Sequence, residues 1–209
     1  MISSSLYSSL DVGEIRLVTL QPKNQSPHIS CTLETVTLED GLQYEALSYA
    51  WGDVSIREFV MIEDVRLTVT TSLKSALRHL RHDTEPRKLW IDAICINQDD
   101  TDERSKQVCI MKDIYTSASS VIIWLGEENA EIALGFNILQ RASPLPHGTW
   151  GNLNDQEFHA LVEVFSRSWW TRAWIVQELS YAREAVVYAG HRSIPWTVLE
   201  SGVDRKSVV

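Results

Sequence analysis

Apolar residues alternate with polar ones in the N-terminal part of the chain, which is the two-residue period of half-buried strands. Four stretches of this region predict strands: 15–20, 29–38, 44–50 and the two arms of a hairpin within 59–69. The hairpin turn at Glu63–Asp64 lacks the glycine that tight turns favour. We expect the first two strands and the hairpin to be antiparallel additions to the main sheet.

Beyond residue 70 the apolar period becomes helical, and predicted helices alternate with short apolar runs. The helical stretches are 71–80, 101–118, 132–142 and 156–178, the last as one helix or two. The expected N-caps of the first two are Thr71 or Ser72, and Asp100. The apolar runs, typical of strands buried on both faces, are 89–94, 121–126 and 185–189. This alternation predicts an α/β fold with a mainly parallel, flavodoxin-like sheet flanked by helices.

The composition restricts the classes of function. The net charge of −9 argues against a nucleic-acid partner and against an anionic membrane surface. The N-terminus lacks the basic and apolar regions of a signal peptide, and no apolar run reaches membrane-spanning length. The motifs GxxxxGK[ST], GxGxxG, GxSxG and HExxH are absent, which disfavours P-loop NTPases, Rossmann dehydrogenases, α/β-hydrolases and zincins.

Three cysteines, Cys31, Cys95 and Cys109, stand in apolar surroundings and predict small buried side chains. They form no CxxC pair, and no Cys/His cluster has the spacing of a zinc site, so we expect no metal. This odd, sparse set, without a signal peptide, indicates a reducing compartment, and we expect a cytoplasmic protein.

Hydrogen-bonding residues follow the predicted strands, where an open α/β sheet binds its ligands beyond the carboxyl ends of the strands. The candidate ligand-binding residues there are Ser48, Tyr49, Trp51, Asp92 and Asn97. A purely structural role is the alternative for each of them. In that case Asp92 would accept backbone N–H bonds from the turn over 94–97.

The segment 168–179 places three tryptophans beside a carboxylate. Trp174 and Glu178 are four residues apart, so a helix would put them on one face. An aromatic plate beside a carboxylate can hold a flat cationic ring and stabilise positive charge next to it. The structural alternative is an amphipathic core helix that buries Trp174 and leaves Glu178 solvated or paired with Arg172.

Three blocks of the chain resemble one family. They are Tyr44–Gly52, Leu89–Gln98 with its continuation to Ala118, and Arg172–Glu178. Together they are similar to the heterokaryon incompatibility (HET) domain of filamentous fungi. The resemblance runs in order from Glu14 to Ala189, and it implies a HET domain over 14–199 with tails over 1–13 and 200–209.

HET domains in turn resemble Toll/interleukin-1 receptor (TIR) domains, so the resemblance implies a TIR-like sheet. Ser168, Trp174 and Glu178–Leu179 are similar to a TIR pattern whose glutamate is catalytic in NAD-cleaving members. Ile175 stands where that pattern has a cysteine. The hairpin within 59–69 lies where TIR domains have a loop and their first helix, and would reshape the pocket.

The resemblance implies an effector of fungal non-self recognition and programmed cell death. One hypothesis is an NAD glycohydrolase, with NAD as substrate and no cofactor, in which Glu178 is catalytic and stabilises an oxocarbenium-like ribose. Its expected substrate-binding residues are Trp174, Ser48, Tyr49, Trp51, Asp92, Asn97, Arg104 and Arg172. The aromatic side chains would stack on a ring, and an arginine would meet the pyrophosphate. As a catalytic carboxylate, Glu178 would not belong to the core.

The alternative hypothesis is a non-catalytic signalling module that acts by homotypic assembly. Its interface anchors would be Trp169, Trp170 and Arg172, since Trp and Arg lead among binding hot spots. The position of Glu178 separates the two hypotheses. A place inside a cleft near Trp51 and Asp92 favours the enzyme, whereas an outer face favours the module.

Overall fold

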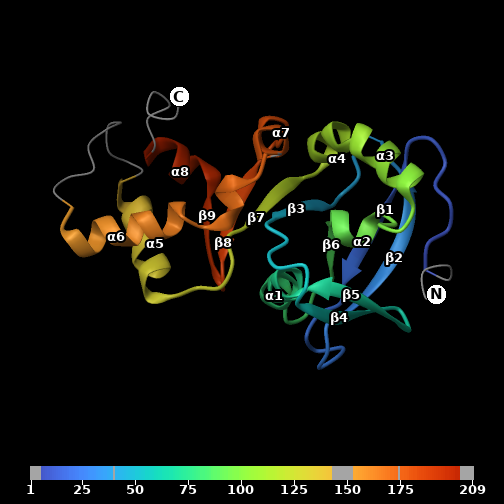
Figure 1. The fold of residues 1–209 in the computed structure, drawn as a ribbon, viewed down its shortest axis with the longest axis horizontal. Coiled ribbons are helices and arrows are strands. Elements are labelled where there is room, and N and C mark those ends of the chain that lie inside the picture. The colour runs from blue at the N-terminus through green and yellow to red at the C-terminus, as the bar shows by residue number, and fades with distance from the viewer. Residues whose placement is uncertain (1–5, 40, 143–152, 174, 203–209) are drawn as a thin grey trace.

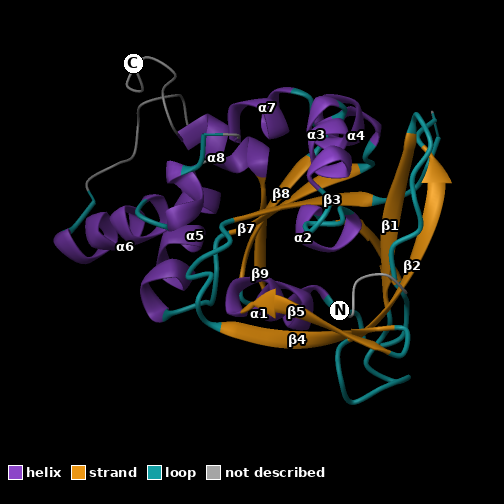
Figure 2. Cartoon of the chain, turned by 45° about the vertical axis from the view of Figure 1, so that its right-hand side comes forward, coloured by secondary structure: helices purple, strands orange, loops and turns teal. Residues whose placement is uncertain are grey.

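The sheet that organises this protein has nine strands within residues 6–39, 41–142, 153–173 and 175–202, which the computed structural model describes (Figure 1). The strands are β1 Glu14–Leu20, β2 Ser30–Thr37, β3 Glu45–Tyr49, β4 Arg57–Ile62, β5 Val65–Thr70, β6 Arg87–Trp90, β7 Ser120–Trp124, β8 Ala185–Ala189 and β9 Arg192–Pro195. The helices are α1 Thr71–Leu80, α2 Asp92–Cys95, α3 Thr101–Cys109, α4 Met111–Ser117, α5 Ala130–Ala142, α6 Asp155–Phe165, α7 Ile175–Ser180 and α8 Trp196–Gly202, with a 3₁₀ helix η2 at Ser168–Thr171. Helix α1 lies on one side of β3 and β7, and α4 and α7 lie on the other (Figure 2).

The strand order is β5-β4-β2-β1-β6-β3-β7-β8-β9. At its centre β6, β3, β7 and β8 are parallel. The register between β3 and β7 runs from Glu45 opposite Ser120 to Tyr49 opposite Trp124. Both strands are buried after their first residue, because helices cover both faces of the sheet there. The predicted α/β class is confirmed.

The expectation of a mainly parallel, TIR-like sheet is not confirmed, because the sheet is mixed. Strand β1 pairs antiparallel with both β2 and β6, with Val18 opposite Leu89. The strand pairs β4–β5 and β8–β9 are also antiparallel, as short connections between neighbouring strands require. The predicted hairpin within 59–69 is confirmed, and Glu63 supplies its turn with a φ of +55° in place of a glycine.

Helix α1 begins where Thr70 accepts a hydrogen bond from the Leu73 N–H, so the cap is Thr70 and not Thr71 or Ser72. The predicted cap Asp100 is confirmed, since its side chain accepts the N–H groups of residues 102 and 103. The helix predicted over 101–118 is interrupted at Ile110 and forms α3 and α4.

Several sequence-based expectations need correction. The strand predicted over 89–94 ends at Trp90, and the helix predicted over 156–178 divides into α6, η2 and α7. Cys31 and Cys95 are buried as expected, but Cys109 is exposed because it lies on the outer face of α3. Strand β9 and helix α8 were not predicted. Most of the segment between the helices predicted over 132–142 and 156–178 lies outside the described residues.

The N-terminal segment predicted as a tail contacts the body of the protein from Leu6 onward. The Tyr7 hydroxyl donates to the Ile94 carbonyl at 2.9 Å, and Arg16 Nη2 donates to the Ser8 carbonyl at 2.5 Å. No helix among the described residues is both long and apolar enough to cross a membrane.

Candidate functional site

Strand β3 ends where the order of the parallel strands reverses. The chain passes from β3 to β6 on one side and later to β7 on the other, so a ligand crevice is expected beyond the carboxyl ends of β3 and β7. Ser48 and Tyr49 close β3 there, and each is 1% exposed. Gly52 then adopts a φ of +72° and turns the chain away, which leaves Trp51 partly exposed at the sheet edge.

Glu178 is the centre of a buried polar network at this edge. Its carboxylate, in a residue that is 1% exposed, accepts the Ser48 hydroxyl. Arg172 binds the same carboxylate in a bidentate manner, with Nη1 at 2.9 Å from Oε2 and Nη2 at 2.8 Å from Oε1. Ser48 Oγ accepts the Trp169 indole N–H at 2.7 Å and Arg172 Nη1 at 2.9 Å. These charge-assisted hydrogen bonds fix the orientation of the carboxylate.

The break between η2 and α7 makes this network possible. Helix η2 ends at Thr171, and Arg172 has extended backbone angles, φ −77° and ψ 137°. The chain therefore folds the Arg172 side chain back onto Glu178, six residues later, in a way that one continuous helix would not allow. The expectation that Glu178 is not a core residue is wrong, and its carboxylate pairs with Arg172, which was one of the two options of the structural alternative. Trp174 lies outside the described residues.

A second group surrounds Asp92, the first residue of α2. Its Oδ2 accepts the Trp51 indole N–H at 3.1 Å, and its Oδ1 accepts the backbone N–H of Ala93 at 2.7 Å. Among the described contacts, the turn over 94–97 makes none of the hydrogen bonds predicted to the Asp92 side chain. The Ile96 N–H donates to the main-chain carbonyl of Asp92, and the N–H groups of residues 94 and 95 donate to the Ile91 carbonyl. Burial raises the pKa of Asp92 to about 6, although the Trp51 and Ala93 hydrogen bonds act in the opposite direction.

Two buried tyrosines connect these groups. Burial raises the pKa of Tyr49 and of Tyr115 well above the ordinary value for a phenol, and the carboxylate of Asp92 adds to the effect in both. The guanidinium of Arg172 acts in the opposite direction on both phenols and on Asp92. The Tyr49 hydroxyl has no hydrogen-bond partner among the described residues. Arg172 and Asp92 therefore belong to one electrostatic environment at the end of β3.

The structure brings together most, but not all, of the residues that the sequence singled out. Ser48, Tyr49, Asp92, Arg172 and Glu178 share the edge of the sheet, with Trp51 hydrogen bonded to Asp92. The backbone N–H of Asn97 donates to Glu103 at 2.7 Å. Arg104 is exposed on α3 and donates to the Gln98 carbonyl at 3.4 Å, so no contact places it in the Glu178 network among the described residues.

Two members of the site were not singled out as site residues. Trp169 appeared in the sequence only as an interface anchor, yet it is 1% exposed and donates to Ser48. Tyr115 appeared only as one of the apolar positions of a helix. Neither role has a local signal, because each depends on contacts with residues far away in the chain.

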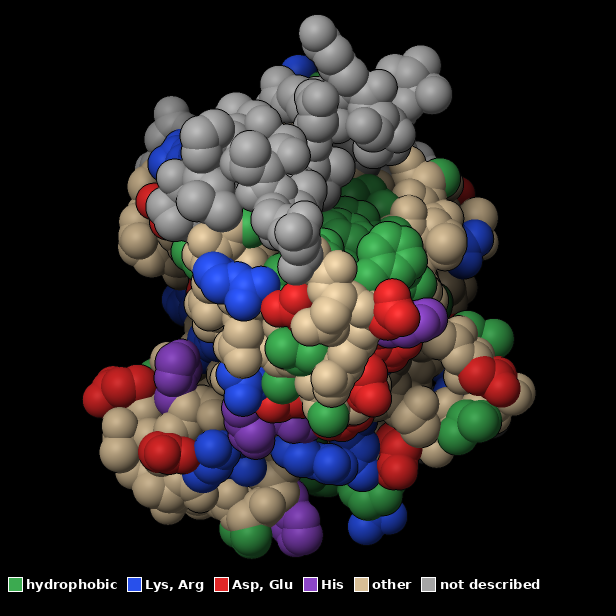
Figure 3. Space-filling model, turned by 90° about the vertical axis from the view of Figure 1, so that its left-hand side faces the viewer, with side chains coloured by type: hydrophobic (Ala, Val, Ile, Leu, Met, Phe, Trp, Pro, Cys, Tyr) green, Lys and Arg blue, Asp and Glu red, His purple; other side chains and the backbone are tan. Residues whose placement is uncertain are grey.

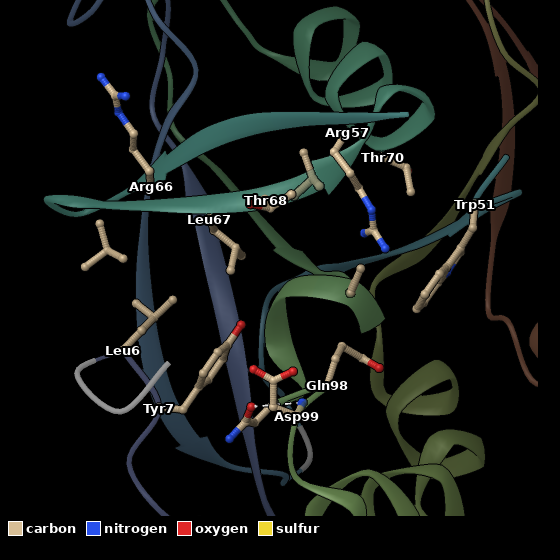
Figure 4. A pocket seen from close by; sticks show the side chains of 14 residues that line it. Leu6, Tyr7, Trp51, Arg57, Arg66, Leu67, Thr68, Thr70, Gln98 and Asp99 are labelled. Atoms are coloured by element: carbon tan, nitrogen blue, oxygen red, sulfur yellow. Dashed lines mark hydrogen bonds between the residues drawn. The ribbon is translucent and has the colours of Figure 1, made fainter. Parts of the chain in front are cut away.

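A cavity of about 470 Å³ lies beside Trp51, between β5 and the segment that follows α2 (Figure 4). Leu6 and Tyr7 from the N-terminal segment, Leu67 from β5, and Gln98 contribute to its walls. The inserted hairpin thus forms one wall of this cavity. Among the described residues, no group of three or more His, Cys, Asp or Glu side chains is placed to hold a metal ion.

Comparison with known proteins identifies the family. The family model described as heterokaryon incompatibility protein (HET) matches residues 44–178. Heterokaryon incompatibility protein 6, OR allele, of Neurospora crassa is 40% identical over 126 residues, which cover 54% of this chain and 18% of the relative. The chain thus spans less than a fifth of that relative, and no solved structure gives a significant match. Because the family match covers more than half of the sequence and includes Ser48, Asp92, Arg172 and Glu178, the chain belongs to the heterokaryon incompatibility (HET) family.

Proposed function

We propose that this chain is an effector module of fungal non-self recognition and programmed cell death that cleaves the nicotinamide–ribose bond of NAD. The family match supports the recognition role. The observation that carries the enzymatic proposal is the position of Glu178, a buried carboxylate at the carboxyl end of a central parallel strand and close to Asp92. The proposal includes a TIR-like arrangement of β6, β3, β7 and β8 and a cytoplasmic location.

One carboxylate is sufficient for this reaction. Nicotinamide leaves as a neutral ring, so the leaving group needs no general acid. The ribose carbon develops oxocarbenium character in the transition state, and a fixed carboxylate stabilises that positive charge. Water then forms the new bond to this carbon and loses a proton to solvent, so the products are nicotinamide and ADP-ribose. In this mechanism Glu178 supplies the charge, while Ser48 and Arg172 hold it in place.

The network leaves a hydrogen-bonding position for substrate. A carboxylate oxygen offers about two acceptor positions. Among the described contacts, Oε1 of Glu178 accepts only Arg172 Nη2, so a ribose hydroxyl has a place there. The Arg172 side chain is 20% exposed and Glu178 is 1% exposed, so an approaching anionic substrate meets the guanidinium first. A substrate that draws Arg172 outward would open the carboxylate to the ribose.

The test is the release of nicotinamide from NAD by the purified protein, followed by chromatography. We expect release by the wild type and a loss on the order of a hundredfold in Glu178→Gln, which removes the charge and keeps the size. Glu45→Gln is the matched control, because Glu45 also forms a bidentate pair with an arginine, Arg87 through Nε and Nη2, at the opposite end of β3. It should keep its activity per folded molecule. A folded wild type that releases no nicotinamide contradicts the proposal.

A second candidate function is a non-catalytic module that acts by self-association. The observation in its favour is an apolar surface on α6, where Phe158 is 58% exposed and Val162 is 46% exposed beside Leu161 and Phe165. Figure 3 views the molecule from this side and shows a group of hydrophobic side chains on it. If this function holds, light scattering should detect assemblies that Phe158→Asp dissolves, and cell death should persist in Glu178→Gln.

A further inference from the structure

The cavity beside Trp51 has a positively charged group directed into it. Arg57 begins β4, and its side chain points into the cavity toward Trp51 and α2 (Figure 4). Arg66, on the neighbouring strand β5, also lines the cavity, but its guanidinium points away from Trp51 and α2 in the same view and lies over the Phe59 ring (Figure 4). The two arginines of one hairpin therefore have different surroundings.

Among the arginines near the cavity and the Glu178 site, Arg57 has a guanidinium that is free of other polar contacts within the described part of the chain. Arg172 is bound to Glu178, Arg104 donates to a carbonyl, and the Arg66 guanidinium lies 4.9 Å from the centre of the Phe59 ring. For Arg57, no ion pair and no hydrogen bond involves its side chain among the described residues. A guanidinium without a partner that faces a cavity favours a phosphate, which it can bind through two parallel hydrogen bonds.

The walls of the cavity suit the rest of a nucleotide. At the end away from Arg57, Leu6, Tyr7 and Leu67 form a largely apolar surface, and the Tyr7 ring is fixed because its hydroxyl donates to Ile94. Gln98 and Asp99 at the floor offer amide and carboxylate groups to sugar hydroxyls. A volume of about 470 Å³ lies within the range of small-molecule sites.

Trp51 joins this cavity to the Glu178 site. Its ring lines the cavity, and its indole N–H is bound to Asp92, whose carboxyl is influenced electrostatically by Glu178 and Arg172. A ligand that extends from the apolar end past Arg57 and Trp51 therefore approaches the buried carboxylate.

We propose that this cavity binds the nucleoside diphosphate half of a dinucleotide substrate, with the base at the Leu67 end and the pyrophosphate on Arg57. The inference rests on the proposed function for its identification of the reacting half at Glu178. It gives the inserted hairpin a role in substrate selection. Arg57 then meets the pyrophosphate, a role that the sequence suggested for Arg104 or Arg172.

The experiment measures the binding of ADP, adenosine and inorganic pyrophosphate to the purified protein by calorimetry. ADP should bind more tightly than adenosine and more tightly than pyrophosphate, since each of these probes lacks one of the two anchors. Arg57→Gln should weaken ADP binding at least tenfold and leave adenosine binding unchanged. Arg66→Gln, an equal loss of charge on the same hairpin, should change neither, and thermal unfolding checks that both variants fold.

The outcomes separate this inference from the proposed function. ADP binding that depends on Arg57, in a protein that cleaves no NAD, supports the cavity and contradicts the enzyme. NAD cleavage whose KM is the same in Arg57→Gln and Arg66→Gln supports the enzyme and overturns the cavity. Equal ADP affinity in the two variants, or no ADP binding by the wild type, also overturns it.

Discussion

Arg172 holds the carboxylate of Glu178 through two parallel hydrogen bonds of 2.9 Å and 2.8 Å, and the Glu178 end of the pair is 1% exposed while the Arg172 side chain is 20% exposed. The pair is therefore asymmetric, with the negative charge in the interior and the positive charge at the surface. A buried carboxylate depends on its partner, because a low-dielectric site disfavours an unpaired charge. The relationship makes Arg172 the accessible part of the site and Glu178 the protected part.

Removal of the Glu178 charge should lower the stability of the fold in addition to its expected effect on activity. Loss of one partner from a fully buried ion pair costs about 3–5 kcal/mol. Arg172 keeps some contact with water, so we expect about 2 kcal/mol for Glu178→Gln. Glu45→Gln should cost less, because the Glu45 side chain is 25% exposed. Urea denaturation measures both values, and a Glu178→Gln variant as stable as the wild type would show that the pair does not form in solution.

The hydrogen bond between Ser48 and Trp169 predicts that substitutions of the two residues have non-additive effects on the free energy of unfolding. Ser48→Ala leaves the buried Trp169 indole N–H without its acceptor, which costs about 1–3 kcal/mol. Trp169→Phe removes the donor, so the additional effect of Ser48→Ala should then be smaller. A double-mutant cycle should give a coupling of about 1 kcal/mol between the two residues. Additive free energies of unfolding would contradict the hydrogen bond.

The raised pKa of Asp92 predicts a pH dependence of stability. The carboxyl has an ordinary pKa near 3.8 in the unfolded chain and about 6 in the fold, so its stabilising contribution is complete below about pH 4 and is lost as pH rises through 6. Asp92→Asn removes this titration. The free energy of unfolding of the wild type, relative to Asp92→Asn, should therefore fall by about 2 kcal/mol between pH 4 and pH 7. A constant difference across this range would show that Asp92 does not have the raised pKa.

Gly135 is predicted to be required for the packing of α5 against α6. A Cβ added there would lie 2.6 Å from Val164 Cγ2 and 2.8 Å from the Ala160 carbonyl oxygen. Alanine favours a helix over glycine by about 1 kcal/mol, but the overlap with backbone in a packed interface costs about 1–3 kcal/mol. We expect Gly135→Ala to lower the melting temperature, whereas Asn137→Ala, at an exposed position of α5, should not. A higher melting temperature in Gly135→Ala than in the wild type would mean that the helices are not packed this closely.

The local elements and the family could be predicted from the amino-acid sequence alone. The alternation of apolar residues was sufficient to predict the hairpin β4–β5, and the apolar runs were sufficient to predict β7 and β8. These patterns depend only on residues that are neighbours in the chain. The cap at Asp100 follows from the same local chemistry. The candidate residues Ser48, Asp92 and Glu178 were found because they follow or accompany such elements.

The way in which these elements pack together could not be predicted, because it depends on contacts between residues far apart in the chain. The sheet is mixed because β1 pairs with β6, and strand pairing over such a distance in the chain leaves no periodic signal. The contacts of Ser48 with Trp169, and the break that folds Arg172 onto Glu178, likewise depend on residues that the fold brings together. Burial is a property of the whole fold, so it was the packing around Glu178 that made its carboxylate an interior, paired group.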